Sequence, residues 1–194
     1  MTKVNEQFPE FDLEYYDPIT KNTGRITNKT LAKKWAVLLF YPADFTYVCP
    51  TELADLAKRY KEFQTLGCEV YVVSTDTVFT HKAWVEQEHL LKDVKYKLIA
   101  DHNGDLVKKL DIYEEATGMA QRGVYIISPE GLLKSLQVVD GNVGRSAGEV
   151  LRQVKALQYV AAHPGMACPA SWDMDGKALK KDIKIAGNVY KELQ

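Results

Sequence analysis

The residue with the clearest capacity for chemistry is Cys49, which lies in the segment YPADFTYVCPTEL at positions 41–53. An apolar run ends as this segment begins, and a helical pattern follows it, so we expect Cys49 at the start of a helix. A helix N-terminus presents unpaired N–H groups and a partial positive charge. Both favour the thiolate, which is the reactive form of cysteine. A buried cysteine that caps the helix is the alternative, and these residues alone do not decide between the two.

Two neighbours of Cys49 add to the reactive interpretation. Thr46 lies three residues before the cysteine, where its hydroxyl could bind an anion or an oxygen-bearing substrate near the sulfur. Pro42 stiffens the loop and can shield the site from water. Pro50 fits the first turn of the predicted helix, because the N–H that proline lacks has no partner there.

The pattern of apolar residues predicts the elements that position this loop. A continuous apolar run indicates a buried strand, and apolar residues spaced three and four apart indicate a helix. Pro129-Glu130-Gly131 indicates a turn between two hairpin strands. Ser146 and Glu149 have the spacing of a capping box. The predicted elements are strands at 35–41, 68–74, 96–100, 122–128 and 132–139, and helices at 50–67, 78–89, 105–110 and 146–162.

Strands that alternate with helices and end in a hairpin indicate an α/β fold with a central mixed β-sheet. The thioredoxin-like fold is one member of that class, and the pattern alone does not single it out. At 194 residues, one core is the default. We expect one domain at 1–165 and, from its Lys-rich and weakly patterned sequence, a C-terminal arm at 166–194.

Charge and hydropathy exclude several classes of partner. The formal charge is −1, which removes the usual electrostatic reason to expect a nucleic-acid or membrane-surface protein. The longest apolar run, 36–41, is far too short to span a membrane. The N-terminus has no basic start followed by an apolar run, so we expect no secretory signal and a cytoplasmic location.

The other cysteines and the histidines give weaker signals. The chain has three cysteines, so at least one has no partner within its own chain. Cys68 begins a predicted strand and is interpreted as a structural, buried thiol. The four histidines form no metal-binding motif, so no metal is expected. No G-x-G-x-x-G follows a strand, so we expect no bound flavin, nicotinamide or other cofactor.

Three separated motifs resemble those of one protein family. The segment 40–52, FYPADFTYVCPTE, is similar to the signature of typical two-cysteine peroxiredoxins. The segment 163–172, HPGMACPASW, resembles the resolving-cysteine segment of that family, and Arg122 stands where the family carries its thiolate-stabilising arginine. The resemblance extends over about 31–172 and is greatest to the bacterial alkyl hydroperoxide reductase C (AhpC) type. It implies a thioredoxin-like fold with a C-terminal arm.

The resemblance also implies roles for individual residues. Cys49 would attack a hydroperoxide and become a sulfenic acid, with Pro42, Thr46 and Arg122 completing the catalytic site. Cys168 would then form a disulfide with Cys49 of a partner subunit. Two residues would have supporting roles. Glu52, one turn along the helix, is placed to orient an arginine, and Arg145 is expected to be part of the same active-site arginine network.

The implied partners are a second copy of the chain and a reductase. The resemblance implies a homodimer, with five dimers forming a decamer, and an antioxidant peroxidase recycled by a flavoprotein disulfide reductase of the AhpF type or by thioredoxin. A redox sensor or holdase chaperone that uses the same thiols is the alternative. A thioredoxin-like oxidoreductase is disfavoured, because residues 49–52 read CPTE and lack the second cysteine of C-x-x-C. A cysteine hydrolase is the weakest candidate, because no histidine lies in a recognisable triad motif.

Overall fold

The computed structural model describes residues 2–193. Their contacts divide the chain into two compact units, Met1–Ala147 and Gly148–Gln194. The helix that follows residue 146 therefore falls almost wholly in the second unit. The boundary expected from composition, after residue 165, stays a prediction about where the arm begins.

The first unit is built on a seven-stranded mixed sheet with the strand order β2-β1-β5-β4-β3-β8-β9. The three middle strands β5, β4 and β3 are parallel to one another. On either side of them, β1 pairs antiparallel with β5, and β8 pairs antiparallel with β3. The strands are β1 (Asp12–Asp17), β2 (Asn22–Thr27), β3 (Trp35–Phe40), β4 (Cys68–Ser74), β5 (Lys97–Ala100), β8 (Arg122–Ile127) and β9 (Leu133–Val139). A separate short hairpin joins β6 (Tyr113–Glu114) to β7 (Met119–Ala120).

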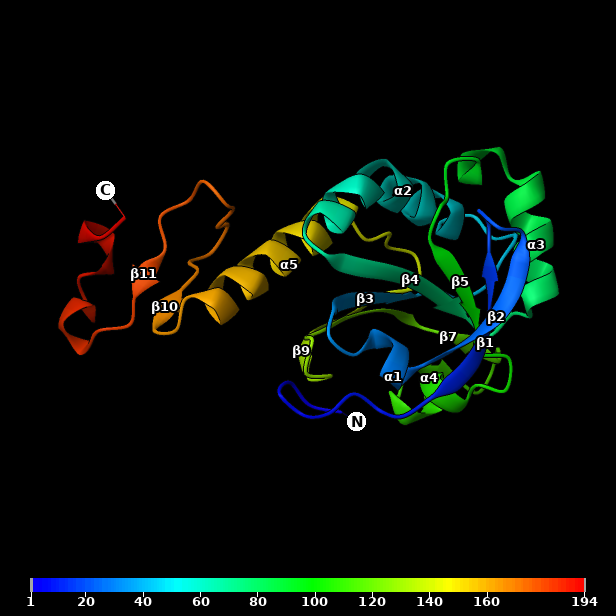
Figure 1. The fold of residues 1–194 in the computed structure, drawn as a ribbon, viewed down its shortest axis with the longest axis horizontal. Coiled ribbons are helices and arrows are strands. Elements are labelled where there is room, and N and C mark those ends of the chain that lie inside the picture. Colours follow the sequence, from blue (N-terminus) through cyan, green and yellow to red (C-terminus); the bar gives the residue numbers. More distant parts are fainter. Residues whose placement is uncertain (1, 194) are drawn as a thin grey trace. The chain divides into compact units, whose positions relative to one another are not determined.

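Helices cover both faces of this sheet, with α2 on one face and α1 and α4 on the other (Figure 1). Successive strand residues point to opposite faces, so β3 has to be apolar throughout. Leu38 and Phe40 join the core cluster that includes the apolar residues of α4, whereas Val37 and Leu39 are buried outside it. The helices are α1 (Asn28–Leu31), α2 (Cys49–Thr65), α3 (Val78–Gln87), the 3₁₀ helix η1 (His89–Leu91) and α4 (Asp105–Lys109).

The second unit consists of one long helix and a longer, irregular segment. The Tyr159 ring stacks on His163 with 4.1 Å between ring centroids, and it packs at a tilt against Trp172 at 4.8 Å. Its elements are α5 (Ala147–Ala162), the hairpin strands β10 (Met166–Ala167) and β11 (Leu179–Lys180), and the 3₁₀ helices η2 (Ile183–Ile185) and η3 (Val189–Lys191). In residues 2–193 no helix combines the length and the apolar character needed to cross a membrane.

The predicted α/β fold with a central mixed sheet is confirmed, and five of the sheet's strands lie where the apolar runs placed them. The apolar runs did not reveal the hairpin β1–β2, because its strands alternate exposed and buried residues and contain several charged ones. The helix expected at 78–89 ends at Gln87 and gives way to η1. The weakly patterned arm holds two short 3₁₀ helices and a short hairpin.

Candidate active site

Cys49 is the first residue of α2, one position before the predicted helix start at residue 50, and its side chain is fully buried. Pro50 follows in the first turn, where it costs no hydrogen bond. The backbone N–H groups of Thr51 and Glu52 both donate to the carbonyl of Val48, which closes the first turn around the cysteine. The thiol therefore lies at the positive end of a 17-residue helix.

A guanidinium contacts the sulfur of Cys49. Arg122 begins β8, and because Val124 pairs with Leu39 of β3, Arg122 lies beside the end of β3 from which the loop to Cys49 departs. Its Nη1 donates to the Cys49 Sγ at 3.3 Å, and its Nε donates to the Gly141 carbonyl at 2.7 Å. A permanently cationic group at this distance can stabilise negative charge that develops on a reacting oxygen beside the sulfur.

Glu52 holds two arginines in place from the same helix turn as Cys49. Arg122 Nη1 donates to Glu52 Oε2 at 2.7 Å, and Arg145 donates from Nε to Oε1 at 2.8 Å and from Nη2 to Oε2 at 3.0 Å. All three side chains are less than 5% exposed. Two buried cations and one carboxylate leave a surplus positive charge, which a thiolate at Cys49 would balance. The structure thus brings together Cys49, Glu52, Arg122 and Arg145.

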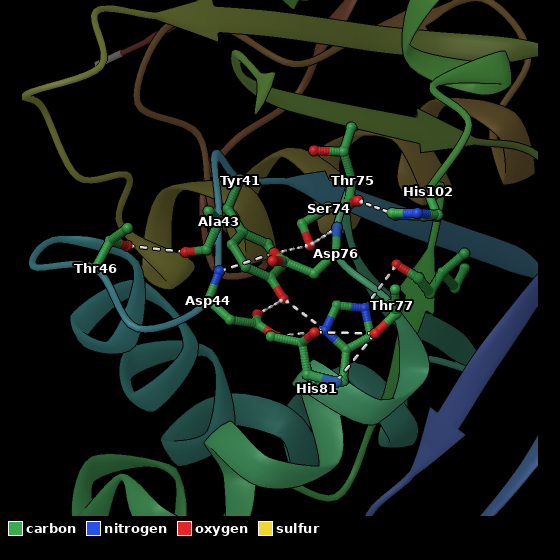
Figure 2. Close-up of polar contacts among 12 residues, drawn as sticks. Tyr41, Ala43, Asp44, Thr46, Ser74, Thr75, Asp76, Thr77, His81 and His102 are labelled. Atoms are coloured by element: carbon green, nitrogen blue, oxygen red, sulfur yellow. Dashed lines mark hydrogen bonds and ion pairs between the residues drawn. The ribbon is translucent and has the colours of Figure 1, made fainter. Parts of the chain in front are cut away.

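The loop that carries Pro42 and Thr46 runs from the end of β3 to Cys49. The Thr46 hydroxyl donates to the Ala43 carbonyl at 2.9 Å (Figure 2). With its proton so directed, the oxygen of Thr46 is free to accept a hydrogen bond from a ligand's O–H. Pro42 is half-buried at the start of the loop. The roles of Pro42 and Thr46 toward a substrate stay predictions.

The other two cysteines differ in their environments. Burial raises the pKa of the Cys68 thiol to about 12, with the charge of Glu69 adding to the effect. Cys68 is therefore a neutral, unreactive thiol at physiological pH. Cys168 is half-buried in the second unit, 3.8 Å from the carbonyl of Ala156. Burial raises the pKa of Cys168 as well, and the charge of Arg152 opposes that rise.

Several groups that complete the site carry no signal in the sequence. The carbonyls of Gly141 and Gly123 accept hydrogen bonds from Arg122 and Arg145, and a backbone acceptor is common to every residue type. The loop before Cys49 is also anchored by Asp44 and His81, which are 37 positions apart and match no spacing rule. Among residues 2–193, no group of three or more His, Cys, Asp or Glu side chains could hold a metal ion.

Comparison with known proteins places these features in one family. Residues 4–136 match the model of the AhpC/TSA family. The chain is 38% identical over 189 residues to alkyl hydroperoxide reductase C of Staphylococcus aureus, covering 97% of this chain and 100% of that protein. The chain therefore belongs to the AhpC/TSA family, and it is a thiol-dependent peroxidase of the peroxiredoxin type.

Solved structures support the same assignment. The crystal structure of Enterococcus faecalis AhpC has a TM-score of 0.83 and 40% identity, covering 87% of this chain and 100% of that one. The reduced 2-Cys peroxiredoxin of Plasmodium vivax has a TM-score of 0.91 and 27% identity, covering 98% of this chain and 100% of that one. The resemblance found in the sequence, and the thioredoxin-like fold it implies, are thus confirmed.

Replacing Glu52 by Gln is expected to destabilise the protein strongly. The substitution leaves two buried guanidinium groups without their counter-charge, which costs about 3–5 kcal/mol of unfolding free energy. It also loosens Arg122, so the oxidation of Cys49 by peroxide should slow. Denaturant unfolding and stopped-flow fluorescence measure the two effects.

A matched control for Glu52 lies on the same helix. Glu62 pairs with Arg59 on the surface, where both side chains are more than 40% exposed. Glu62→Gln should change the unfolding free energy by less than about 1 kcal/mol, because exposed pairs contribute little. Equal losses for the two variants would contradict the role of Glu52 as the shared anchor of the arginines.

Cys68 is expected to be dispensable for chemistry. Because it is buried with a raised pKa, iodoacetamide should label it only after unfolding, as peptide mass spectrometry would show. Cys68→Ala should lower the unfolding free energy by about 1 kcal/mol, a typical value for a small change in the core, and leave peroxide turnover unchanged. Labelling of Cys68 in the native protein, or loss of turnover in Cys68→Ala, would contradict this assignment.

Proposed function

We propose that Cys49 is the peroxidatic cysteine and that it reduces hydrogen peroxide and organic hydroperoxides. The observation that carries this proposal is the contact between Arg122 and the Cys49 sulfur at 3.3 Å. The buried cluster around it contains two arginines and one glutamate, so a negative charge on the sulfur would balance its excess positive charge. The relatives named as hydroperoxide reductases support the choice of substrate. No contact in the described residues favours the alternative of a redox sensor or holdase.

The first step is the attack of the Cys49 thiolate on one oxygen of the hydroperoxide. The S–O bond forms as the O–O bond breaks, the sulfur loses two electrons, and the departing alkoxide or hydroxide takes a proton to leave as alcohol or water. Arg122 stabilises the charge that develops on the departing oxygen. Thr46, whose own proton is directed to Ala43, accepts a hydrogen bond from the substrate's O–H and holds it in line.

The second step forms a disulfide between Cys49 and Cys168. The Cys168 sulfur attacks the sulfenic acid, and the hydroxyl leaves as water with the proton of the thiol. We propose that the two cysteines belong to different subunits of a homodimer, and that five dimers form a decamer. An external dithiol then returns both cysteines to thiols by exchange; a flavoprotein disulfide reductase of the AhpF type and thioredoxin are the two proposed donors. We also propose a cytoplasmic location, where cellular reductants keep thiols reduced.

Cysteine variants test these roles. Cys49→Ser should consume no peroxide. Cys168→Ser should consume about one peroxide per chain and stall as the sulfenic acid, because no resolving thiol is left to convert the sulfenic acid into a disulfide. A dye-based peroxide assay and intact-mass measurement follow both. A Cys168→Ser variant that turns over normally with a physiological reductant would refute the resolving role.

Non-reducing gel electrophoresis after one equivalent of peroxide tests the pairing between subunits. The wild-type chain should run as a covalent dimer, and either Cys→Ser variant should run as a monomer. A wild-type monomer that contains an internal crosslink would contradict the intersubunit disulfide.

The rate of disulfide formation should rise with pH. Because burial raises the pKa of Cys168, only a small fraction of this thiol is ionised at neutral pH, and the fraction grows as pH increases through about pH 7 to 9. Arg152→Gln removes the charge that opposes the rise, so the rate at a given pH should fall. Stopped-flow fluorescence after peroxide mixing measures this step.

Lys155 provides the control for Arg152. It lies on the same helix and pairs with Asp173 at 3.0 Å, and it does not contribute to the pKa of Cys168. Lys155→Gln should leave the rate of disulfide formation unchanged. A rate that does not depend on pH, or that rises in Arg152→Gln, would show that ionisation of Cys168 does not control the step.

A further inference from the structure

A buried polar network lies beneath the loop that leads to Cys49, and the proposed chemistry does not use it (Figure 2). Asp44 belongs to the loop, and His81 belongs to α3. The Asp44 Oδ2 and the His81 Nδ1 are 2.8 Å apart, and both side chains are fully buried. Buried charged groups are costly unless they are paired and fully hydrogen-bonded, so a pair of this kind needs a reason.

The contacts of this pair indicate how its protons are arranged. His81 Nε2 lies 3.2 Å from the carbonyl oxygen of Ile99, which can only accept, so Nε2 carries a hydrogen. Tyr41 donates from its hydroxyl to Asp44 Oδ1 at 2.7 Å. One further proton lies between Nδ1 and Oδ2, and the pair is neutral overall whichever atom holds it. Burial raises the pKa of the Asp44 carboxyl, and the hydrogen bond with His81 opposes that rise.

The backbone of Asp44 is anchored as firmly as its side chain. Its N–H donates to Asp76 Oδ2 at 2.9 Å, and the Ser74 hydroxyl donates to the same oxygen at 2.7 Å. Ser74 ends β4, and Asp76 follows it in the turn before α3. One loop residue is therefore connected to β4, α3 and, through His81, to β5.

The anchored residue is followed directly by strained backbone. Phe45 has a φ of 55°, in the left-handed region that a bulky side chain seldom adopts, and the residue is 53% exposed. Such a conformation is strained and persists only when its surroundings enforce it. Thr46, the next residue, closes the turn through its hydrogen bond to Ala43. The strain therefore favours opening of the loop, and the anchor at Asp44 opposes it.

We propose that Asp44 and His81 are positioning residues that hold the loop 42–48 closed over Cys49 and thereby set the balance between peroxide reduction and disulfide formation. The closed loop holds Thr46 in its hydrogen-bonded turn and keeps the Cys49 sulfur inaccessible, with no exposed surface. A hydroperoxide is a small molecule, whereas the Cys168 thiol arrives together with its peptide segment, so disulfide formation requires this loop to open much further than the entry of peroxide does. Loss of the anchor should therefore slow the first step and accelerate the second. This inference rests on the proposed peroxidase function.

Asp44→Ala tests the proposal in the full-length chain. Stopped-flow fluorescence resolves the second-order oxidation of Cys49 by hydrogen peroxide and the first-order formation of the disulfide. We expect oxidation to slow by about tenfold or more, since a small misplacement of a positioning group has effects of that size. We expect disulfide formation to become several-fold faster in the same variant. Asp44→Asn should recover much of both rates, because its amide can donate to unprotonated Nδ1 while its oxygen accepts from Tyr41.

Two further variants keep the result interpretable. Tyr41→Phe removes one hydrogen bond to Asp44 and should shift both rates in the same directions by a smaller amount, even if Asp44→Ala does not fold. Leu106→Ala, in the core cluster at α4, lowers stability without touching the network and should leave both rates unchanged. Rates that fall together, that are unchanged in Asp44→Ala, or that follow the melting temperature would overturn the proposal. Failure of the peroxidase function itself would instead show in the wild-type chain, as oxidation of Cys49 no faster than that of a free thiol.

Discussion

The structure of the site depends on the cancellation of charge in a volume without water. Glu52 lies between the guanidinium groups of Arg122 and Arg145, and all three are almost completely buried. A carboxylate or guanidinium alone in such a place would cost several kcal/mol, so none of the three is stable there without the others. The Cys49 thiol joins this cluster as the remaining member, at 3.3 Å from Arg122.

This constraint explains why the fold needs its mixed sheet. Glu52 and Cys49 come from the first turn of α2, Arg122 from the first residue of β8, and Arg145 from the segment after β9. The antiparallel pairing of β8 with β3 brings Arg122 to the edge where the loop from β3 enters α2. The carbonyls of Gly141 and Gly123 accept one further hydrogen bond each, from Arg122 and Arg145 respectively. Segments far apart in the chain thus meet because the strand register requires it.

The sequence was sufficient for the parts of the site that follow local rules. Cys49 was predictable as the first residue of a helix from the proline after it, and Glu52 from its spacing of one turn. Arg122 and Arg145 required the resemblance to a family, because nothing local links them to residue 49. The pair of Asp44 and His81 could not be predicted, since it forms only when α3 packs beneath the loop.

The same limit applies to the fold. Continuous apolar runs identified the buried central strands, because each of their faces packs against a helix. The edge hairpin β1–β2 exposes one face, and charged residues on that face interrupt its strands, so neither strand forms a continuous apolar run. The arm resisted prediction because its 3₁₀ turns are three residues long, too short to establish a periodic pattern.

The charge balance around Cys49 has a consequence for the order of events in one turnover. A thiolate makes the cluster with Glu52 and its two arginines neutral, whereas the sulfenic acid that replaces it carries no charge. In the proposed mechanism, oxidation would therefore leave a buried positive charge without a partner, and we expect the closed conformation to become less favourable at the step in which the sulfur is exposed. The oxidation state of the Cys49 sulfur would thus determine the conformation of the loop. The closed form would be favoured before the peroxide reacts, and the open form would be favoured afterwards.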